Sequence, residues 1–308
     1  MPVTACQPIF ARLTQSIVGK QVPLQLIVAT LLAGGHVLLE DVPGVGKTLL
    51  ARTLADALGG DWKRVQFAPD MLPSDITGVN IFHPGSGEFR FVPGPLFSHV
   101  VLADEINRAS PRTQASLLEA MEEGRVTVDG HTYALPRPFL VIATQNPIEH
   151  QGTFPLPEAQ LDRFAVCVSL GYPTPDEEKS LLAREVEGSA SASPVFPVID
   201  PATLLSWQAE VRTVHVDETL QHYLVEIAGR TRSHHGIVLG VSPRGCIIWQ
   251  RVSQALAWLD GRRYVLPDDI KAAALPVLAH RIVLPGHVGT EARKRVLEEL
   301  FQSVPLPL

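Results

Sequence analysis

One short segment of the 308-residue chain constrains its fold more than any other. An apolar run at residues 37–39 leads into Gly44-Val45-Gly46-Lys47-Thr48, and leucines at helical spacing follow from residue 50. The glycines let successive backbone N–H groups turn toward phosphate oxygens, and the N-terminus of the following helix adds positive potential. In this strand–loop–helix setting, Lys47 can reach the phosphates and the Thr48 hydroxyl can ligate Mg²⁺. The residues predicted to contact nucleotide here are Pro43, Gly44, Val45, Gly46, Lys47, Thr48 and Leu49.

The loop departs from the usual phosphate-binding pattern at one position. Five residues before the last loop glycine, where the pattern has glycine, this chain has Asp41. A negative charge is unfavourable beside phosphates, so we expect the Asp41 side chain to point away from the loop. Gly44, two residues before Gly46, partly restores the flexibility that the missing glycine would have given.

Strands and helices alternate over the first half of the chain. Continuous apolar runs of four or five residues are typical of strands covered on both faces, as in a parallel sheet. This alternation predicts a doubly wound α/β core over residues 1–172, a connecting segment over 173–200 and an all-helical domain over 201–308. The strand candidates lie at residues 37–39, 65–67, 100–103, 139–143 and 164–168.

Two predicted hairpins interrupt this core. Residues 79–92 indicate two short strands around Pro84-Gly85-Ser86-Gly87, and residues 126–135 indicate two more around Asp129-Gly130. Each hairpin is either surface decoration or a projection toward a channel or a partner.

Polar residues end two of the predicted buried strands. Asp104 and Glu105 follow the run at 100–103, and Asn146 follows the run at 139–143. Ligands of open α/β sheets bind at this carboxyl edge. We therefore expect Asp104 to hold Mg²⁺ through water, Glu105 to activate the attacking water, and the Asn146 amide to hydrogen-bond the γ-phosphate or that water.

Two arginines are further candidates. Arg163 precedes the last core strand, and Arg244 follows Pro243 at the predicted start of a helix in the second domain. A guanidinium can stabilise charge on a transferring phosphoryl group, although an arginine considered alone is more often explained by an exposed ion pair.

Composition excludes several other classes of protein. The net charge of −6 argues against a strongly basic nucleic-acid binder, and no apolar run approaches the roughly 20 residues of a membrane span. The first residues lack the basic and apolar regions of a signal peptide. Three widely spaced cysteines, Cys6, Cys167 and Cys246, fit reduced thiols in a cytoplasmic protein better than disulfides.

Taken together, these motifs resemble the AAA+ ATPases, and more closely the MoxR family within them. The resemblance extends over roughly residues 10 to 300. The matching segments are 39–48, 103–109 (Ala-Asp-Glu-Ile-Asn-Arg-Ala), 114–123, 143–147 (Ala-Thr-Gln-Asn-Pro), 156–164, 171–178 and 242–245 (Ser-Pro-Arg-Gly).

The resemblance implies a phosphate-loop AAA+ core with the sheet order 5-1-4-3-2 and a C-terminal helical lid. It implies ATP and Mg²⁺ as ligands, with Thr48 and Asp104 at the metal and Glu105 and Asn146 at the reacting phosphate. Arg163 resembles the arginine finger that enters a neighbouring subunit's site, and Arg244 resembles the second sensor. Val18 and Gly19 lie in a segment similar to the one that lines the adenine pocket. This family commonly carries an acid or another non-glycine residue at the position of Asp41.

The function that this resemblance implies is an ATP-driven remodelling motor or chaperone. It would form a homo-oligomer, with a hexameric ring expected, and would mature or activate a client protein or insert its metal. A partner carrying a von Willebrand factor A domain is expected. Two other functions remain open: a nucleic-acid-associated AAA+ motor, and a nucleotide-gated scaffold with little turnover. The charge argues against the first, and the intact Glu105 argues against the second.

Overall fold

The computed structural model describes residues 6–42, 44–146, 152–186, 197–286 and 289–305. Five parallel strands form its central sheet in the order β2-β5-β8-β1-β9. Numbered along the chain as core strands one to five, this is the predicted order 5-1-4-3-2, which is confirmed. The strands are β1 Val37–Glu40, β2 Trp62–Gln66, β5 Val100–Asp104, β8 Leu140–Gln145 and β9 Val166–Val168.

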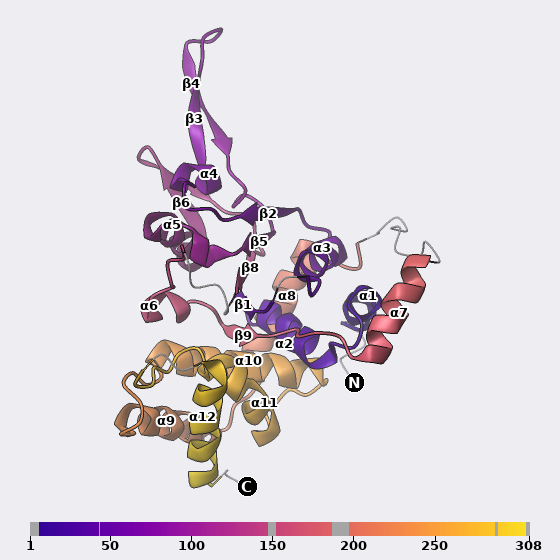
Figure 1. Cartoon of the computed structure of the whole chain (residues 1–308), viewed down its shortest axis with the longest axis vertical. Helices are drawn as coiled ribbons and strands as arrows, with labels where there is room; N and C mark the ends of the chain where they lie inside the picture. The colour runs from indigo at the N-terminus through magenta and orange to yellow at the C-terminus, as the bar shows by residue number, and fades with distance from the viewer. Residues whose placement is uncertain (1–5, 43, 147–151, 187–196, 287–288, 306–308) are drawn as a thin grey trace.

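Helices cover both faces of this sheet (Figure 1). Leu39 and Ile142 belong to one buried cluster, whereas their strand neighbours Leu38 and Val141 belong to another. Because successive side chains of a strand point to opposite faces, this division explains the continuous apolar runs in the sequence. The first face packs against α1 Gln7–Ser16, α2 Gln21–Leu32 and α3 Lys47–Ala57, and the second against α5 Pro111–Glu123.

Both predicted hairpins are present. Asp129 and Gly130 have φ values of 48° and 80°, the pair of positive angles that a tight two-residue turn requires. The first hairpin follows the short helix α4 and projects far from the sheet (Figure 1). Phe91 stacks on Tyr133 with ring centroids 4.0 Å apart, so the two hairpins support each other. Their elements are α4 Pro73–Thr77, β3 Gly78–His83, β4 Glu88–Pro93, β6 Arg125–Val128 and β7 His131–Ala134.

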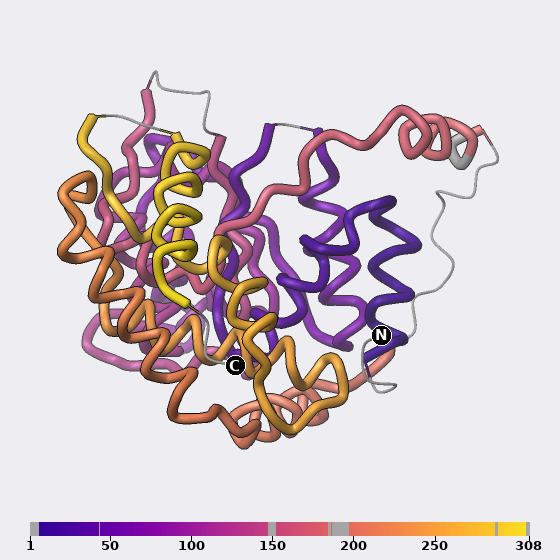
Figure 2. The backbone as a smooth tube through the Cα atoms, turned by 90° about the horizontal axis from the view of Figure 1, so that it is seen from below, coloured from indigo at the N-terminus to yellow at the C-terminus, as the bar shows by residue number. Residues whose placement is uncertain are grey.

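The connecting segment contains a helix, α7 Pro175–Val186, with Asp176, Glu177 and Glu178 in its first turn. Figure 2 shows α7 at the outer side of the molecule, beyond the two N-terminal helices. Residues 187–196 of the predicted connecting segment lie outside the described residues. Helix α8 Pro201–Arg212 then returns to the core, and two short helices, η1 Ile106–Arg108 and α6 Glu158–Leu161, complete it.

The C-terminal region is helical. Pro243 occupies the first turn of α10, where the Ser242 hydroxyl accepts a hydrogen bond from the Gly245 N–H. This is the helix start that the sequence predicts. Trp249 is fully buried on α10 and belongs to the same hydrophobic cluster as α2, so this region packs directly on the core. The helices are α9 Glu218–Ser233, α10 Pro243–Leu259, α11 Pro267–Leu278 and α12 Thr290–Ser303. Within the described ranges, no helix has the length and apolar character needed to cross a membrane.

Candidate nucleotide site

The phosphate loop lies at the edge where the strands end. Gly44 and Gly46 have φ values of +86° and +91°, a region that favours glycine, and Gly46 is the N-cap of α3. Within the described part of the chain, no side chain caps this helix end, and its first turn holds no acid. Its first N–H groups therefore remain available to an anion, and their partial positive charge favours a phosphate. Pro43 lies outside the described residues.

A cavity of about 380 Å³ opens in front of this loop. It brings together the loop, the ends of two central strands and the edge strand β2. Its lining residues are Gly44, Gly46, Lys47, Thr48, Leu49, Arg64, Gln66, Asp104, Glu105 and Asn146. Most of the predicted site residues therefore share one cavity, as expected for side chains at the carboxyl edge of a parallel sheet.

Asp41 points away from the cavity, as its charge predicts. Its buried carboxylate accepts hydrogen bonds from the Ser169 hydroxyl at 2.7 Å and from the N–H groups of Leu170 and Gly171 at 2.6 and 2.9 Å. Its carbonyl oxygen accepts from the Lys47 ammonium at 3.2 Å. Asp41 thus fixes the loop to the chain that follows β9, and its carboxylate leaves the phosphate space free.

The buried Asp104 carboxylate is held from two sides. Its Oδ1 accepts from the Thr144 hydroxyl at 2.6 Å, and its Oδ2 accepts from Arg64 Nη2 at 2.6 Å. The Thr144 hydroxyl also accepts from the Glu105 N–H at 2.9 Å. Because both Asp104 oxygens are already engaged, the geometry favours a water-mediated contact between Asp104 and a metal.

Glu105 is oriented toward the cavity by its own backbone and by two neighbours. It adopts a left-handed conformation with φ 56°, which ends β5 abruptly. Its Oε2 accepts from the Gln66 amide at 2.8 Å and from Arg108 Nη1 at 3.1 Å. A carboxylate held in this way beside the phosphate loop can orient and deprotonate a water molecule.

The turn between α1 and α2 lies next to the phosphate loop. A Cβ added to Gly46 would lie 3.6 Å from Ile17 Cδ1, and Val45 packs against the same cluster as Ile17. Gly19 has φ +73° and is closed in by the Glu177 carboxylate from α7. Neither Val18 nor Gly19 lines the cavity described above, so their contact with adenine stays a prediction.

Arg163 and Arg244 do not line this cavity either. Arg163 precedes β9 and therefore lies at the edge where the strands begin. Both guanidiniums contact one carboxylate, Glu122 at the end of α5, at 3.0 Å from Arg163 and 2.6 Å from Arg244. The adjacent Met121 carbonyl contacts His36 Nε2 at 3.1 Å, just before β1, which fixes Glu122 at the same edge. The two arginines thus lie together at the amino ends of the strands, whereas Lys47 lies at the carboxyl ends.

Sequence reasoning missed Arg64, Gln66 and Glu122. The first two lie two residues apart on β2, with side chains on the same face, and Gln66 pairs directly with Asp104 in the sheet. The predicted strand order already puts β2 beside β5, so polar residues at alternate positions near the end of β2 were an available signal. No local pattern marks Glu122.

These residues fit a Mg²⁺–nucleotide. Apart from its two chain neighbours, no described residue has an atom within 4 Å of a Cβ built on Gly44, so the loop backbone is open to a close-fitting anion. Lys47 supplies a positive charge, Thr48 supplies an oxygen ligand of the kind that Mg²⁺ prefers, and the Asp104 carboxylate can hold the ion through water.

Comparisons with known proteins agree with this geometry. Residues 36–166 match the family described as "ATPase family associated with various cellular activities (AAA)", and residues 229–300 match the AAA lid domain. The chain is 50% identical over 293 residues to the uncharacterised protein YeaC of Bacillus subtilis, covering 94% of this chain and 91% of that one. It is 39% identical to Chaperone MoxR1 of Mycobacterium tuberculosis, covering 94% and 79% of the two chains. A solved structure of a candidate ATPase from Cytophaga hutchinsonii superposes with a TM-score of 0.89 at 36% identity, covering 99% of this chain and 95% of that one.

Proposed function

Because this chain belongs to the MoxR family of AAA+ ATPases, we propose that it hydrolyses ATP to remodel a partner protein, using sites completed by a neighbouring copy of itself. One observation carries the proposal. The phosphate loop and Glu105 lie at the carboxyl ends of the strands, whereas Arg163 and Arg244 lie together at the amino ends. Each copy then binds a nucleotide beside its own general base, Glu105, and presents the guanidiniums of Arg163 and Arg244 to the next copy.

Within one copy, Lys47 and the loop N–H groups would bind the phosphates, Thr48 would hold Mg²⁺ directly, and Asp104 would hold it through water. Bound Mg²⁺ supplies electrostatic stabilisation of the phosphate charge. Glu105 accepts the proton of the attacking water, while Gln66 and Arg108 hold its carboxylate in position. The Asn146 amide hydrogen-bonds the γ-phosphate or that water without adding charge.

The neighbouring copy supplies Arg163 and Arg244, whose guanidiniums stabilise the charge spread over the transferred phosphoryl group. Since the surface that gives the arginines differs from the surface that receives them, the contact is head-to-tail, and it forms a ring where the rotation between successive copies closes. The family resemblance favours a hexamer in the cytoplasm, a partner with a von Willebrand factor A domain and a protein client. The two hairpins are the candidate client contacts.

Mixing two inactive variants tests the proposal. Glu105→Gln lacks the base but keeps its arginines, whereas Arg163→Ala keeps the base but lacks one arginine. Each variant alone should bind ATP and turn it over poorly, while an equimolar mixture should recover a substantial fraction of wild-type turnover because some interfaces combine both intact halves.

Steady-state hydrolysis should also rise in specific activity with protein concentration. Flat activity per subunit, an active Arg163→Ala protein or a mixture no better than its components would each refute completion of the site by a second copy.

A further inference from the structure

Glu122 is shared by the two arginines. Its Oε2 lies 3.0 Å from Arg163 and its Oε1 lies 2.6 Å from Arg244, so each carboxylate oxygen meets one guanidinium. The side chains of Glu122, Arg163 and Arg244 are 38%, 28% and 41% exposed. Solvent therefore reaches all three groups, and one anion can replace another there without unfolding the chain.

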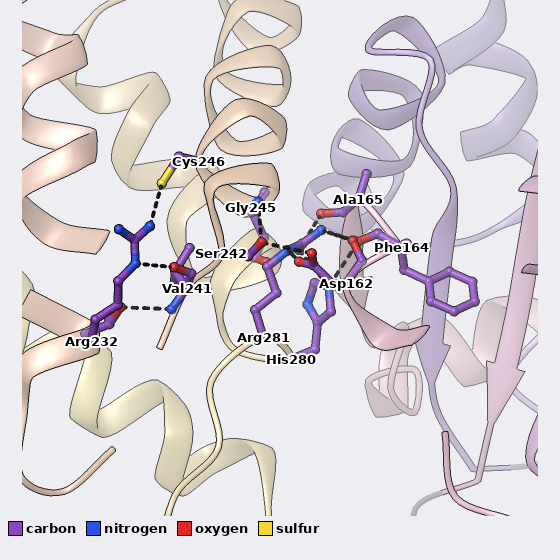
Figure 3. Close-up of polar contacts among 12 residues, drawn as sticks. Asp162, Phe164, Ala165, Arg232, Val241, Ser242, Gly245, Cys246, His280 and Arg281 are labelled. Carbon is purple, nitrogen blue, oxygen red and sulfur yellow. Dashed lines mark hydrogen bonds and ion pairs between the residues drawn. The ribbon is translucent and has the colours of Figure 1, made fainter. Parts of the chain in front are cut away.

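The two arginines also belong to one rigid unit, because their neighbours in the chain are joined by a second carboxylate (Figure 3). Asp162, immediately before Arg163, accepts a hydrogen bond of 2.8 Å from the Ser242 hydroxyl. Ser242 is the N-cap of α10, which carries Arg244 in its first turn. This hydrogen bond thus joins the segment that carries Arg163 to the N-terminus of α10, close to the backbone positions of both arginines.

Arg281 locks this junction from inside the protein. Its buried guanidinium donates to Asp162 Oδ1 at 2.8 Å and also to the carbonyl oxygens of Phe164 and Ala165 (Figure 3). Burial lowers the pKa of Arg281 to about 10, which still leaves it charged at neutral pH. A charged group satisfied on this many sides resists rearrangement, so the spacing between Arg163 and Arg244 is set before any anion arrives.

We propose that Arg163 and Arg244 form a preassembled anion site whose resident counter-ion is Glu122, and that a phosphate group of the neighbouring copy's nucleotide displaces it. A guanidinium binds carboxylate and phosphate through the same paired geometry, and a terminal phosphate carries more charge than one carboxylate. This proposal rests on the proposed function, since it takes the two arginines to act on a second copy.

Glu122 then acts as a positioning residue that opposes assembly. In the isolated chain it pairs with the two guanidiniums, and in the assembly it competes with the phosphate for them. Removing its charge should leave the arginines in position through the Asp162 junction while removing the competitor.

The test is ATP hydrolysis measured against protein concentration for wild type, Glu122→Gln, Glu122→Ala and the matched control Glu123→Gln. Glu123 is the adjacent carboxylate, and it pairs with Arg125 instead. We expect both Glu122 variants to reach half-maximal specific activity at a concentration about two- to tenfold lower than wild type, the range that exposed ion pairs allow. Glu123→Gln should match wild type.

An unchanged or raised midpoint in the Glu122 variants, with Glu123→Gln at the wild-type value, would overturn the proposal, because Glu122 would then be neutral or would support the arginines. A lost activity would have the same meaning, provided that the unfolding midpoint and ATP affinity of the isolated chain are unchanged. Arg163→Ala distinguishes failure of this proposal from failure of the proposed function. If Arg163→Ala is inactive, a negative result overturns only the role of Glu122. If it is fully active, completion of the site by a second copy is overturned as well.

Discussion

The carboxylate of Asp41 accepts a hydrogen bond of 2.6 Å from the backbone N–H of Leu170, which joins the phosphate loop to the end of β9. The chain beyond Leu170 continues to Tyr172, whose carbonyl accepts from the Lys20 ammonium at 2.7 Å. One short segment therefore contacts both the phosphate loop and the turn between α1 and α2. A residue that looks unfavourable beside phosphates in the sequence instead holds the loop in shape.

Asp41→Asn should lower the free energy of unfolding by about 2–3 kcal/mol, because the buried site loses charged acceptors and gains an amide facing other N–H groups. ATP affinity should fall with it, since the loop loses its anchor. Denaturant unfolding and nucleotide titration measure the two effects. Ser169→Ala removes one of the three hydrogen bonds and should cost about 1 kcal/mol or less. Equal stability of Asp41→Asn and wild type would show that the anchor is unimportant.

Gln66→Leu should lower kcat about tenfold while changing ATP affinity little. The substitution removes the 2.8 Å hydrogen bond to Glu105 Oε2 and leaves the phosphate loop untouched, so the effect falls on the orientation of the base. Lys63→Leu, on the same strand with its side chain on the opposite face, is the matched control. A Gln66→Leu protein that loses ATP binding instead would assign Gln66 to the binding of nucleotide.

The buried His36 should make the free energy of unfolding fall in mild acid. Its Nδ1 accepts the Val141 N–H at 3.0 Å and its Nε2 contacts the Met121 carbonyl at 3.1 Å, an arrangement that suits the neutral ring. Burial lowers the pKa of His36 from 6.5 to about 4. The unfolded chain therefore binds this proton first, and the stabilising contribution is complete above pH 6.5 and is lost as the pH falls toward 4.

The loss from His36 alone should reach about 2–3 kcal/mol by pH 4.5. His36→Asn cannot titrate, so its free energy of unfolding should depend less on pH over this range than that of wild type. The exposed His83→Asn is the control and should retain the wild-type slope. Identical slopes for wild type and His36→Asn would contradict a buried, neutral His36.

Deleting residues 128–132 should loosen the first hairpin without affecting nucleotide binding. The turn contributes Asp129, whose carboxylate accepts from the Asn80 amide at 2.7 Å, and the deletion also disturbs the adjoining Tyr133–Phe91 stack. Amide hydrogen exchange should accelerate in β3 and β4, while ATP affinity stays within about twofold of wild type because the turn is remote from the cavity. Loss of ATP binding would show that the second hairpin supports the nucleotide site directly.

The sequence alone predicts much of this architecture, because many of its features are determined by interactions between residues close together in the chain. Helix starts at Pro243, the Asp129-Gly130 turn and the apolar strand runs depend on residues close together in the chain. The orientation of Asp41 also followed from charge alone. The strand order came from resemblance, and it brought the residues at the strand ends into one cavity.

What the sequence does not predict depends on partners distant in the chain. Gln66 acts on Glu105 only because β2 pairs with β5. Glu122 meets both Arg163 and Arg244 only because the N-terminus of α10 is bonded to the segment that precedes β9. Nothing near Glu122 distinguishes it from Glu123, although one carboxylate binds two candidate catalytic arginines and the other binds Arg125. Such pairings are properties of the tertiary fold and leave no periodic trace.

The separation of Lys47 from Arg163 determines how many complete nucleotide sites an assembly contains. Under the proposed function, an open row of subunits always contains one complete site fewer than its number of subunits, because its first and last members each hold an unmatched half. A closed ring contains as many sites as subunits. Closing the ring therefore adds one working site without adding any protein, and the fractional gain is largest for the smallest assemblies. Turnover per subunit, compared with mass measured on the same sample, thus reports ring closure itself.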